Sequence, residues 1–340
     1  MPSSHGPLSL DIAIEPWRLK TPFRITGYVM EAVDLVVCTV SRGGLSGRGE
    51  ATGVYYHDET GAGMAAALGA VREAIEAGVD RQGAQELLPP GGARNALDCA
   101  LWELESKEAG VPVWKLAGLD ATRPLKTTFT LGADTPEAMA RKASGLTGAQ
   151  AIKLKLIGDG EDAARVAKVR AARPDVWIGV DANQAFDRAG TEALIPHLAA
   201  AEVGLLEQPC RIGDEESLQG LNAPMPLAAD ESVQTSADIA RMAGIFDVIN
   251  IKLDKSGGLT EGLKMAHEAR RRGLQVMVGN MVGTSLSCAP GFIVGQLCEV
   301  VDLDGPWHLS GDRERTVSYA GGMVDCDPAI WGAPDGREAA

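Results

Sequence analysis

The sequence predicts a closed parallel α/β barrel that follows a separate α+β domain. From about residue 126, short β-rich runs alternate with Ala-, Glu- and Arg-rich stretches of helical character. Eight such runs with intervening helices are typical of a parallel barrel. The 340 residues are enough for one large barrel with an attached domain. An open doubly wound sheet is the alternative, and the absence of a Gly-rich dinucleotide fingerprint after any run counts against it.

Each expected barrel strand is a short apolar run that ends in polar residues. The eight runs are KTTFTLG (126–132), QAIKLKL (150–156), VWIGVDAN (176–183), VGLLEQP (203–209), PLAADES (226–232), DVINIKLDK (247–255), LQVMVGN (274–280) and EVVDLDG (299–305). Stretches such as TPEAMARKASGL and LTEGLKMAHEARRRG lie between them and have helical composition. The barrel is therefore expected to occupy residues 126–310.

Residues 1–125 have a different pattern, which predicts an α+β domain. LDIAIEPWRL and AVDLVVCTVSRGG are typical of antiparallel strands, and MAAALGAVREAIEAG and ARNALDCALWELESKEAG are typical of helices. In the last of these, Leu97, Leu101 and Leu104 recur at helical spacing. The tail, residues 311–340, is expected to pack back onto this first domain.

Composition excludes several classes of function. A net charge of −14 argues against a general nucleic-acid surface, which needs basic patches. No signal-peptide pattern opens the sequence, and no apolar stretch approaches the roughly 20 residues that span a bilayer. The six cysteines have no CxxC spacing, so neither a zinc site nor a disulfide framework is favoured. We expect a cytoplasmic protein with no nucleic-acid or membrane partner.

Charged residues gather at the ends of the expected strands, where barrels carry their active-site groups. In strand order they are Lys153 and Lys155, Asp181 with Asn183, Glu207, Asp230 with Glu231, Lys252, and Asp302 with Asp304. A polar residue follows an apolar run in each case, so this edge of the barrel is the expected site.

Three of these acids, Asp181, Glu207 and Asp230, end adjacent strands and should converge. Carboxylates without a neighbouring His or Cys form an oxygen-only site, which favours Mg²⁺ over zinc. The alternative is that each acid caps the helix after it. Three uncompensated carboxylates this close would repel one another, which counts against that alternative.

Two lysines, Lys155 and Lys252, are expected on opposite sides of the metal-binding strands. A divalent cation and a second lysine nearby would lower the pKa of each toward neutrality, so that it could act as a base. Two such groups facing each other suit removal of a proton from one face of a carbon and its return on the other. The alternative is that Lys153 and Lys155 are solvated or bind a phosphate. Lys255 is expected to support its neighbours or to start a helix.

The motifs IKLKL, VDANQ, LEQP, ADES and NIKLDKSGG, in this order, resemble those of the enolase superfamily and its muconate-lactonizing subgroup. With ARNALDCALWELE in the first domain, the resemblance covers nearly the whole chain. It implies a (β/α)7β TIM-like barrel with an N-terminal α+β capping domain, in an enzyme that abstracts a proton next to a carboxylate or carbonyl. A homo-oligomer is compatible with the resemblance.

NIKLDKSGGLTEG and VDLDGP further resemble the bacterial Ala-Glu dipeptide epimerases, which are isomerases. Asp302 and Asp304 flank Leu303 and share one face of a strand, which suits a cation. The resemblance implies that this pair holds the α-ammonium of a dipeptide. A second metal, or a cap for the last loop of the barrel, is the alternative.

The same resemblance implies roles for the other site residues. The C-terminal carboxylate of the dipeptide would bind Mg²⁺ at Asp181, Glu207 and Asp230. Lys155 and Lys252 would remove and return the α-proton, and Lys153 would stabilise the ene-diolate. Thr130, at the end of the first barrel strand, would contact the substrate.

The capping domain is expected to choose the substrate side chain through two loops, residues 22–32 and 52–60. Epimerases that act on a C-terminal glutamate carry an arginine several residues beyond a PF pair, where this chain has Gly27, Tyr28 and Val29. Arg24 is then the candidate for an acidic dipeptide, and an apolar side chain is the alternative. N-acylamino acid racemisation, o-succinylbenzoate synthesis, muconate cycloisomerisation and a non-catalytic relative are the other readings of the sequence.

Overall fold

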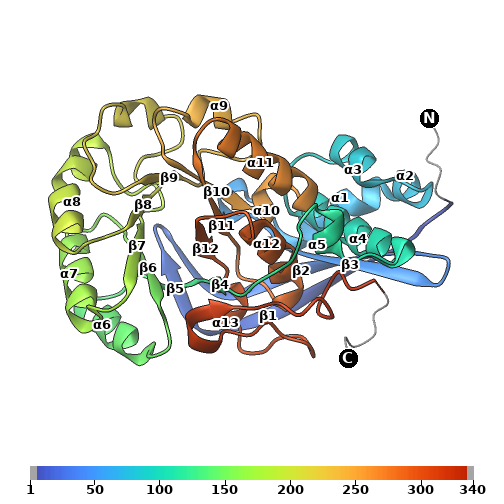
Figure 1. Ribbon diagram of the computed structural model, residues 1–340, viewed down its shortest axis with the longest axis horizontal. Coiled ribbons are helices and arrows are strands. Elements are labelled where there is room, and N and C mark those ends of the chain that lie inside the picture. Colours follow the sequence, from blue (N-terminus) through green and yellow to red (C-terminus); the bar gives the residue numbers. More distant parts are fainter. Residues whose placement is uncertain (1–5, 335–340) are drawn as a thin grey trace.

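A three-stranded antiparallel sheet covered by helices forms the first part of the chain in the computed structural model, which describes residues 6–334 (Figure 1). Its strands are β1 (Ser9–Ile25), β2 (Tyr28–Arg42) and β3 (Leu45–Thr52), and its helices are α1 (Gly61–Ala70), α2 (Arg72–Glu76), α3 (Arg81–Leu87), α4 (Gly92–Ala109) and α5 (Val113–Leu116). The sequence predicted β1, β2 and α4 but not β3, whose glycines and charges hide its strand pattern. Those glycines have a packing role. A Cβ at Gly47 or Gly49 would lie 2.0 Å from a carbonyl oxygen of α4, so β3 reaches the helix only without side chains there.

Eight parallel strands form the second part and confirm the predicted fold class. They are β5 (Thr128–Leu131), β6 (Ala151–Lys155), β7 (Trp177–Asp181), β8 (Leu205–Glu207), β9 (Leu227–Ala229), β10 (Val248–Lys252), β11 (Gln275–Gly279) and β12 (Val300–Asp302). Every one of them falls within a run expected from the sequence. The ladder runs from β5 to β12 in chain order, and side chains bridge the remaining seam. There the Leu303 amide donates to the Thr127 hydroxyl at 3.0 Å, and the Thr128 hydroxyl donates to Asp302.

Helices surround these strands on the outside, as the row of α6, α7 and α8 in Figure 1 illustrates. The outer helices are α6 (Pro136–Gly145), α7 (Asp162–Ala172), α8 (Arg188–Ala200), α9 (Ile239–Met242), α11 (Leu259–Arg271) and α12 (Ser285–Gly295). Two short helices, α10 (Leu253–Ser256) and α13 (Gly305–His308), follow β10 and β12 and contact the capping domain. Between β8 and β9 the described chain has only a 3-10 turn, Glu215–Leu218. Within residues 6–334, no helix has the length and apolar character needed to cross a membrane.

The tail after the barrel contacts the capping domain in the described residues. Its strand β13 (Met323–Val324) pairs with β4 (Leu125–Lys126) just before the barrel. The Arg48 guanidinium donates to the Ile330 carbonyl at 2.9 Å, and the Trp331 indole donates to the Arg48 carbonyl at 2.8 Å. Arg313 forms a 2.5 Å ion pair with the buried Glu50 of β3.

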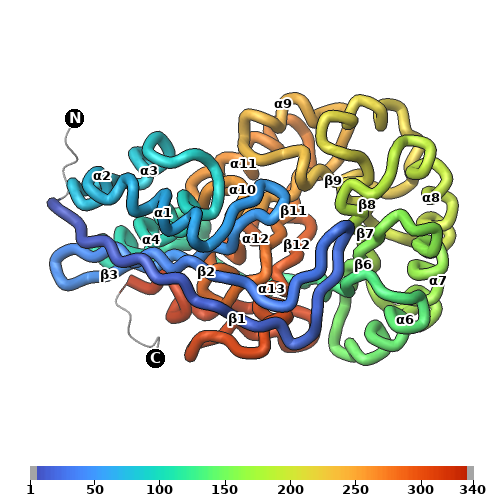
Figure 2. The backbone as a smooth tube through the Cα atoms, turned by 180° about the vertical axis from the view of Figure 1, so that it is seen from behind, coloured from blue at the N-terminus to red at the C-terminus, as the bar shows by residue number. Residues whose placement is uncertain are grey.

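The hairpin of β1 and β2 extends from the capping domain to the mouth of the barrel, where its tip lies beside β6 and β7 (Figure 2). At that tip the Thr26 hydroxyl lies 3.1 Å from the Leu156 carbonyl and 3.2 Å from the Ala182 carbonyl. These carbonyls directly follow Lys155 and Asp181. The capping domain therefore roofs the edge of the barrel where the charged residues were expected.

Candidate active site

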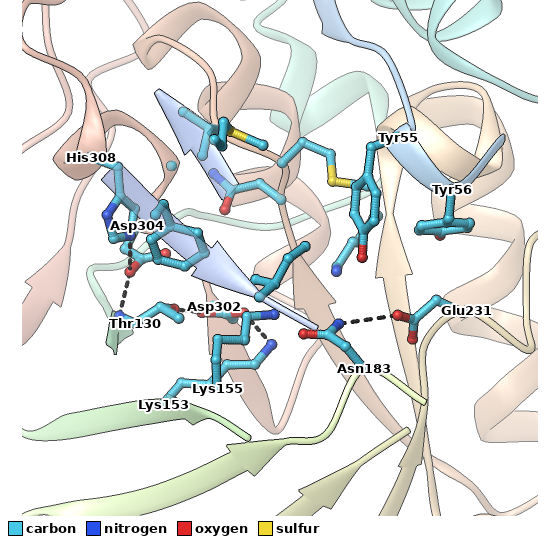
Figure 3. Close-up of a pocket in the computed structure, with 18 residues that line it drawn as sticks. Tyr55, Tyr56, Thr130, Lys153, Lys155, Asn183, Glu231, Asp302, Asp304 and His308 are labelled. Atoms are coloured by element: carbon cyan, nitrogen blue, oxygen red, sulfur yellow. Dashed lines mark hydrogen bonds and ion pairs between the residues drawn. The ribbon is translucent and has the colours of Figure 1, made fainter. Parts of the chain in front are cut away.

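A cavity with an empty volume of about 630 Å³ lies between the ends of the barrel strands and the capping hairpin. The barrel contributes its floor, which includes Lys153, Lys155 and Lys252. The capping domain contributes its roof, which includes Phe23, Ile25, Met30, Tyr55 and Tyr56. Figure 3 shows the polar lining residues in two groups, with Asp302, Asp304, Thr130 and His308 at one end and Asn183, Glu231, Tyr55 and Tyr56 at the other.

Asp181, Glu207 and Asp230 converge as the sequence predicted. They end or follow β7, β8 and β9, and one carboxylate oxygen from each lies within 4.8 Å of the others. All three side chains are fully buried, behind the lysines that line the floor. Three buried oxygen donors without a nitrogen or sulfur donor fit a hard divalent cation, and such a buried carboxylate triad is typical of a divalent metal site.

The surroundings shift the pKa values of the three acids in different directions. Burial and the neighbouring Asp181 raise the pKa of Glu207 to about 8. Burial alone would also raise the pKa of Asp181, but Lys155 and Lys153 outweigh it and lower that pKa. Lys252 and Lys255 lower the pKa of Asp230 in the same way. The lysines therefore favour the ionised forms of Asp181 and Asp230, whereas Glu207 favours its protonated form near neutral pH.

The two lysines expected as acid and base lie on opposite sides of this cluster. Lys155 of β6 lies 2.6 Å from Asp181, and Lys252 of β10 lies 2.5 Å from Asp230. The expected lowering of the Lys252 pKa is not what the protein groups alone produce. Burial is the largest influence on Lys252 and lowers its pKa, but Asp230, Glu207 and Asp181 together outweigh burial and raise it. A divalent cation bound by these carboxylates would act on Lys252 in the opposite direction and lower its pKa.

Lys153 connects the carboxylate cluster with the Asp302 end of the cavity. Its ammonium lies 2.7 Å from Glu207, 2.8 Å from Asp302 and 3.1 Å from Asp181. This position excludes a solvated surface lysine, because Lys153 is only 3% exposed. Lys255 lies 2.7 Å from the Asp230 carboxylate and also donates to the Asp230 carbonyl, so it holds this member of the cluster in place.

Asp302 and Asp304 both line the cavity, while Leu303 between them is fully buried in the core. Asp302 ends β12, and Asp304 precedes α13. The backbone amide of Thr130 donates to Asp304 at 2.6 Å, and the Thr130 hydroxyl lies 3.3 Å from Asp302. Thr130 thus contacts both acids, while its expected contact with the substrate stays a prediction.

Two polar residues at this end were missed in the sequence. His308 of α13 lies 3.0 Å from Asp304 through Nε2, and it lowers the pKa of Asp304 against the effect of burial. Asn280 follows β11 and, oriented to match its neighbours, bonds the Asp302 carbonyl and the Gly305 amide, both at 3.1 Å. The sequence signal that identified the acids, a polar residue directly after an apolar run, would also have identified Asn280. The i+4 spacing from Asp304 is the only local signal for His308.

At the opposite end, Asn183 donates to Glu231 at 3.1 Å, beneath the two tyrosines of the roof. Burial and Asp230 raise the pKa of Glu231 to about 7. Tyr55 and Tyr56 lie in a 3-10 turn within the predicted loop 52–60. No periodic pattern singles out residues in such a turn, so the sequence identified the loop but not the tyrosines.

The roof is attached to the floor by buried polar contacts. The Asp254 carboxylate, two residues beyond Lys252, accepts from the Thr52 amide at 2.9 Å and from Asn95 at 3.1 Å. The Thr52 hydroxyl donates to the Val282 carbonyl at 2.6 Å, and Glu59 accepts from the Val54 amide at 3.1 Å. The turn that carries Tyr55 and Tyr56 is therefore fixed at both ends.

Arg24 does not line this cavity. Side chains alternate along β1, and Phe23 and Ile25 point into the cavity while Arg24 between them lines a neighbouring groove. The expected contact of Arg24 with a C-terminal glutamate needs a guanidinium on the inner face of the hairpin, and the alternation puts it on the outer face.

Comparison with known proteins identifies both parts of the chain. Residues 8–118 match the mandelate racemase and muconate lactonizing enzyme N-terminal domain, and residues 137–329 match the enolase C-terminal domain-like family. The chain is 36% identical to the L-Ala-D/L-Glu epimerase of Escherichia coli K12 over 312 residues, which cover 91% of this chain and 97% of that protein. It is 38% identical to an N-acetyl-D-glutamate racemase of a Pseudoalteromonas species over 253 residues, 74% of this chain and 79% of that protein.

A solved structure is similar over nearly the full length. It is an enolase family member from Agrobacterium tumefaciens with homology to dipeptide epimerases, with bound sodium and L-Ala-L-Glu. The TM-score is 0.93 at 37% sequence identity, and the match covers 96% of this chain and all of that one.

Proposed function

The chain belongs to the mandelate racemase and muconate lactonizing enzyme family of the enolase superfamily, and from that premise we propose that it is a dipeptide epimerase. The observation that carries this proposal is the position of Lys155 and Lys252 on opposite sides of a buried carboxylate cluster. Two acid–base groups that face each other suit inversion of a carbon between them, and relatives of this class support the choice of a dipeptide.

In the proposed reaction, one of Lys155 and Lys252 removes the α-proton of the C-terminal residue of the dipeptide. The electron pair moves into the adjacent carboxylate, and the Lys153 ammonium stabilises the charge that develops there. The opposite lysine then donates a proton to the other face of the α-carbon, which inverts the centre.

Asp181, Glu207 and Asp230 are the proposed ligands of the metal, for which we propose Mg²⁺ because all the donors are oxygens. A divalent cation held there would bind the substrate carboxylate and stabilise the negative charge of the enolate. Apolar roof side chains cover this region, and a less polar surrounding strengthens the electrostatic contacts beneath them.

The substrate ammonium is assigned to Asp302 and Asp304. Both acids are at most 5% exposed, so an ammonium that meets them is largely desolvated and forms charge-assisted hydrogen bonds. Thr130 and His308 orient Asp304 for this contact. This end of the cavity therefore favours a free N-terminus.

A second candidate function is racemisation of an N-acylated amino acid. Two observations favour it: the similarity to an N-acetyl-D-glutamate racemase, and the hydrogen bonds and ion pair that already occupy both oxygens of Asp302. An acyl group carries no positive charge, and it would leave the Asp304 carboxylate without a cationic partner from the substrate.

A screen of L,L-dipeptides in D₂O tests the proposal. Deuterium should appear at the α-carbon of the C-terminal residue, together with the L,D product, as measured by mass spectrometry and chiral chromatography. Each active dipeptide is then compared with its N-acetylated form. Faster turnover of the free dipeptide supports the epimerase, and turnover of the acetylated form alone supports the second candidate.

A further inference from the structure

A second cavity, with an empty volume of about 1660 Å³, adjoins the active site and is called the outer groove here. It lies between the outer face of the β1–β2 hairpin, the loop after β5, the loop after β6, and α13. Phe23, Thr130 and His308 line both cavities, so they form the junction. Thr130 and His308 are also the two residues that hold Asp304.

This junction fixes which part of a substrate faces the outer groove. If Asp302 and Asp304 hold the α-ammonium, then the side chain of the N-terminal residue leaves its α-carbon beside Thr130 and His308. The C-terminal side chain lies at the reacting carbon, between Lys155 and Lys252 and beneath the roof. The outer groove is therefore the space that the N-terminal side chain can enter.

The hairpin presents different chemistry to the two cavities because its side chains alternate. Phe23 pairs with Met30 in the hairpin, and both line the active-site cavity. Arg24 pairs with Val29, and both line the outer groove. The active-site face of the hairpin is apolar, and the groove face carries a cation.

The backbone of Arg24 is fixed to the barrel close to the junction. The Ala133 amide donates to the Arg24 carbonyl at 2.9 Å. Gly132 lets the two chains approach this closely, since a Cβ there would lie 3.0 Å from the Arg24 nitrogen. Gly132 follows Thr130 by only two residues, so Arg24 is anchored next to the residue that contacts both Asp302 and Asp304.

The charges of the outer groove leave Arg24 available for a ligand. Its six charged side chains are Arg24, Lys142, Arg165, Asp134, Asp159 and Glu161. Lys142 pairs with Asp134 at 2.9 Å, and Arg165 pairs with Asp159 at 2.5 Å. Within residues 6–334, the Arg24 guanidinium forms no hydrogen bond or ion pair. It does act at a distance on Asp134, whose pKa is lowered mainly by Lys142 and to a smaller extent by Arg24.

We propose that the outer groove binds the side chain of the substrate's N-terminal residue, and that Arg24 there selects an acidic side chain. This inference rests on the proposed dipeptide epimerase function and adds a substrate class to it, dipeptides that begin with glutamate or aspartate. Arg24 is a specificity residue in this scheme and takes no part in the proton transfers.

The test varies the N-terminal residue and keeps the C-terminal residue that the D₂O screen finds fastest. Wild-type kcat/KM should be about fivefold higher for the Glu-dipeptide than for the Gln-dipeptide at low salt, the effect expected of an ion pair of about 1 kcal/mol that is open to solvent. The preference should lie in KM and should shrink as salt is added. Arg24→Gln should abolish it, and Arg24→Glu should transfer it to the Lys-dipeptide.

Arg141 provides the matched control. It is an exposed arginine on α6 that does not line the groove, so Arg141→Gln makes the same change of charge nearby and should keep the preference. A second series, Ala-Glu against Ala-Gln, tests the C-terminal position. If Arg24→Gln weakens the preference in that series instead, or if wild type treats Glu- and Gln-dipeptides alike, the inference is wrong. If no dipeptide exchanges deuterium at all, the proposed function itself fails, which is a separate result.

Discussion

The floor and the roof of the active-site cavity are built in opposite ways. The floor consists of charged residues at the ends of parallel strands, where Lys153, Lys155 and Lys252 contact buried carboxylates. The roof consists of aromatic and aliphatic side chains from one hairpin tip and one 3-10 turn, and Tyr28 at the tip is 42% exposed. The barrel fixes the floor through its strand register, while a few polar contacts fix the roof.

The floor and the roof therefore differ in how much a substitution costs. A floor residue cannot change without leaving a buried charge unpaired, which costs several kcal/mol, on the order of 3–5. A roof residue can change at the cost of one packing contact. The floor should therefore determine the reaction and the roof the substrate, and variants in each should affect different kinetic constants.

The largest expected effect is on the floor, in the variants Lys155→Met and Lys252→Met. Each removes one of the two acid–base groups while keeping an unbranched side chain of similar length. Epimerisation should fall by about 10²- to 10⁴-fold, the usual contribution of a positioned general acid or base. The measurement is the rate of formation of the L,D-dipeptide from the L,L-dipeptide.

Deuterium exchange provides the control within the same variants. The lysine that remains can still exchange the α-proton on its own side, so each variant should exchange only one stereoisomer. The two variants should exchange opposite isomers. Full epimerase activity in both would exclude the two-lysine scheme.

The sequence predicted the floor well because local rules place its residues. An apolar run that ends in a charge predicts both a barrel strand and the edge at which that charge lies, as for Glu207 at the end of β8 and Asp230 after β9. The positions of the roof residues depend on how two segments of the capping domain meet the barrel, which local rules do not predict. The alternation that turns Arg24 away from the cavity is visible only once the hairpin has been placed against β5.

Asp254 lies where floor and roof meet, and it gives the next prediction. Burial raises its pKa to about 7, although the bonds from Thr52 and Asn95 oppose this. The folded protein therefore keeps a proton on Asp254 that the unfolded chain releases near pH 4. Its stabilising contribution is complete below about pH 4 and is lost as the pH rises through about 7.

Asp254→Asn keeps an oxygen that can accept from Thr52 but cannot ionise. The free energy of unfolding of wild type relative to this variant should fall by at most about 4 kcal/mol between pH 4 and pH 8. Urea unfolding at several pH values measures the difference. Parallel profiles for the two proteins would mean that Asp254 does not change its ionisation on folding.

Metal binding tests the floor without any substrate. A cation held by the carboxylate cluster would stabilise only the folded protein, so Mg²⁺ at about 100 times its Kd should add about 2.7 kcal/mol to the free energy of unfolding. Glu207→Gln should remove most of this gain, and it keeps the oxygen that accepts from Asn250 at 2.8 Å. Thermal unfolding at constant ionic strength measures the effect, with choline chloride replacing MgCl₂ in the control. An equal gain in the variant would place the ion elsewhere.

The smallest expected effect is on the roof, where Tyr28 of the hairpin stacks on Tyr55 of the turn. Their ring centroids are 5.3 Å apart with an angle of 5° between the planes, and this stack joins the two roof segments above the cavity. Loss of such a pair costs about 0.5–1.5 kcal/mol, so Tyr28→Ala should raise KM by about 2- to 12-fold. Because Tyr28 does not reach the lysines, kcat should stay within about twofold. Tyr28→Phe keeps the ring and should behave as wild type, whereas a fall in kcat with unchanged KM in Tyr28→Ala would show that the roof also takes part in the chemistry.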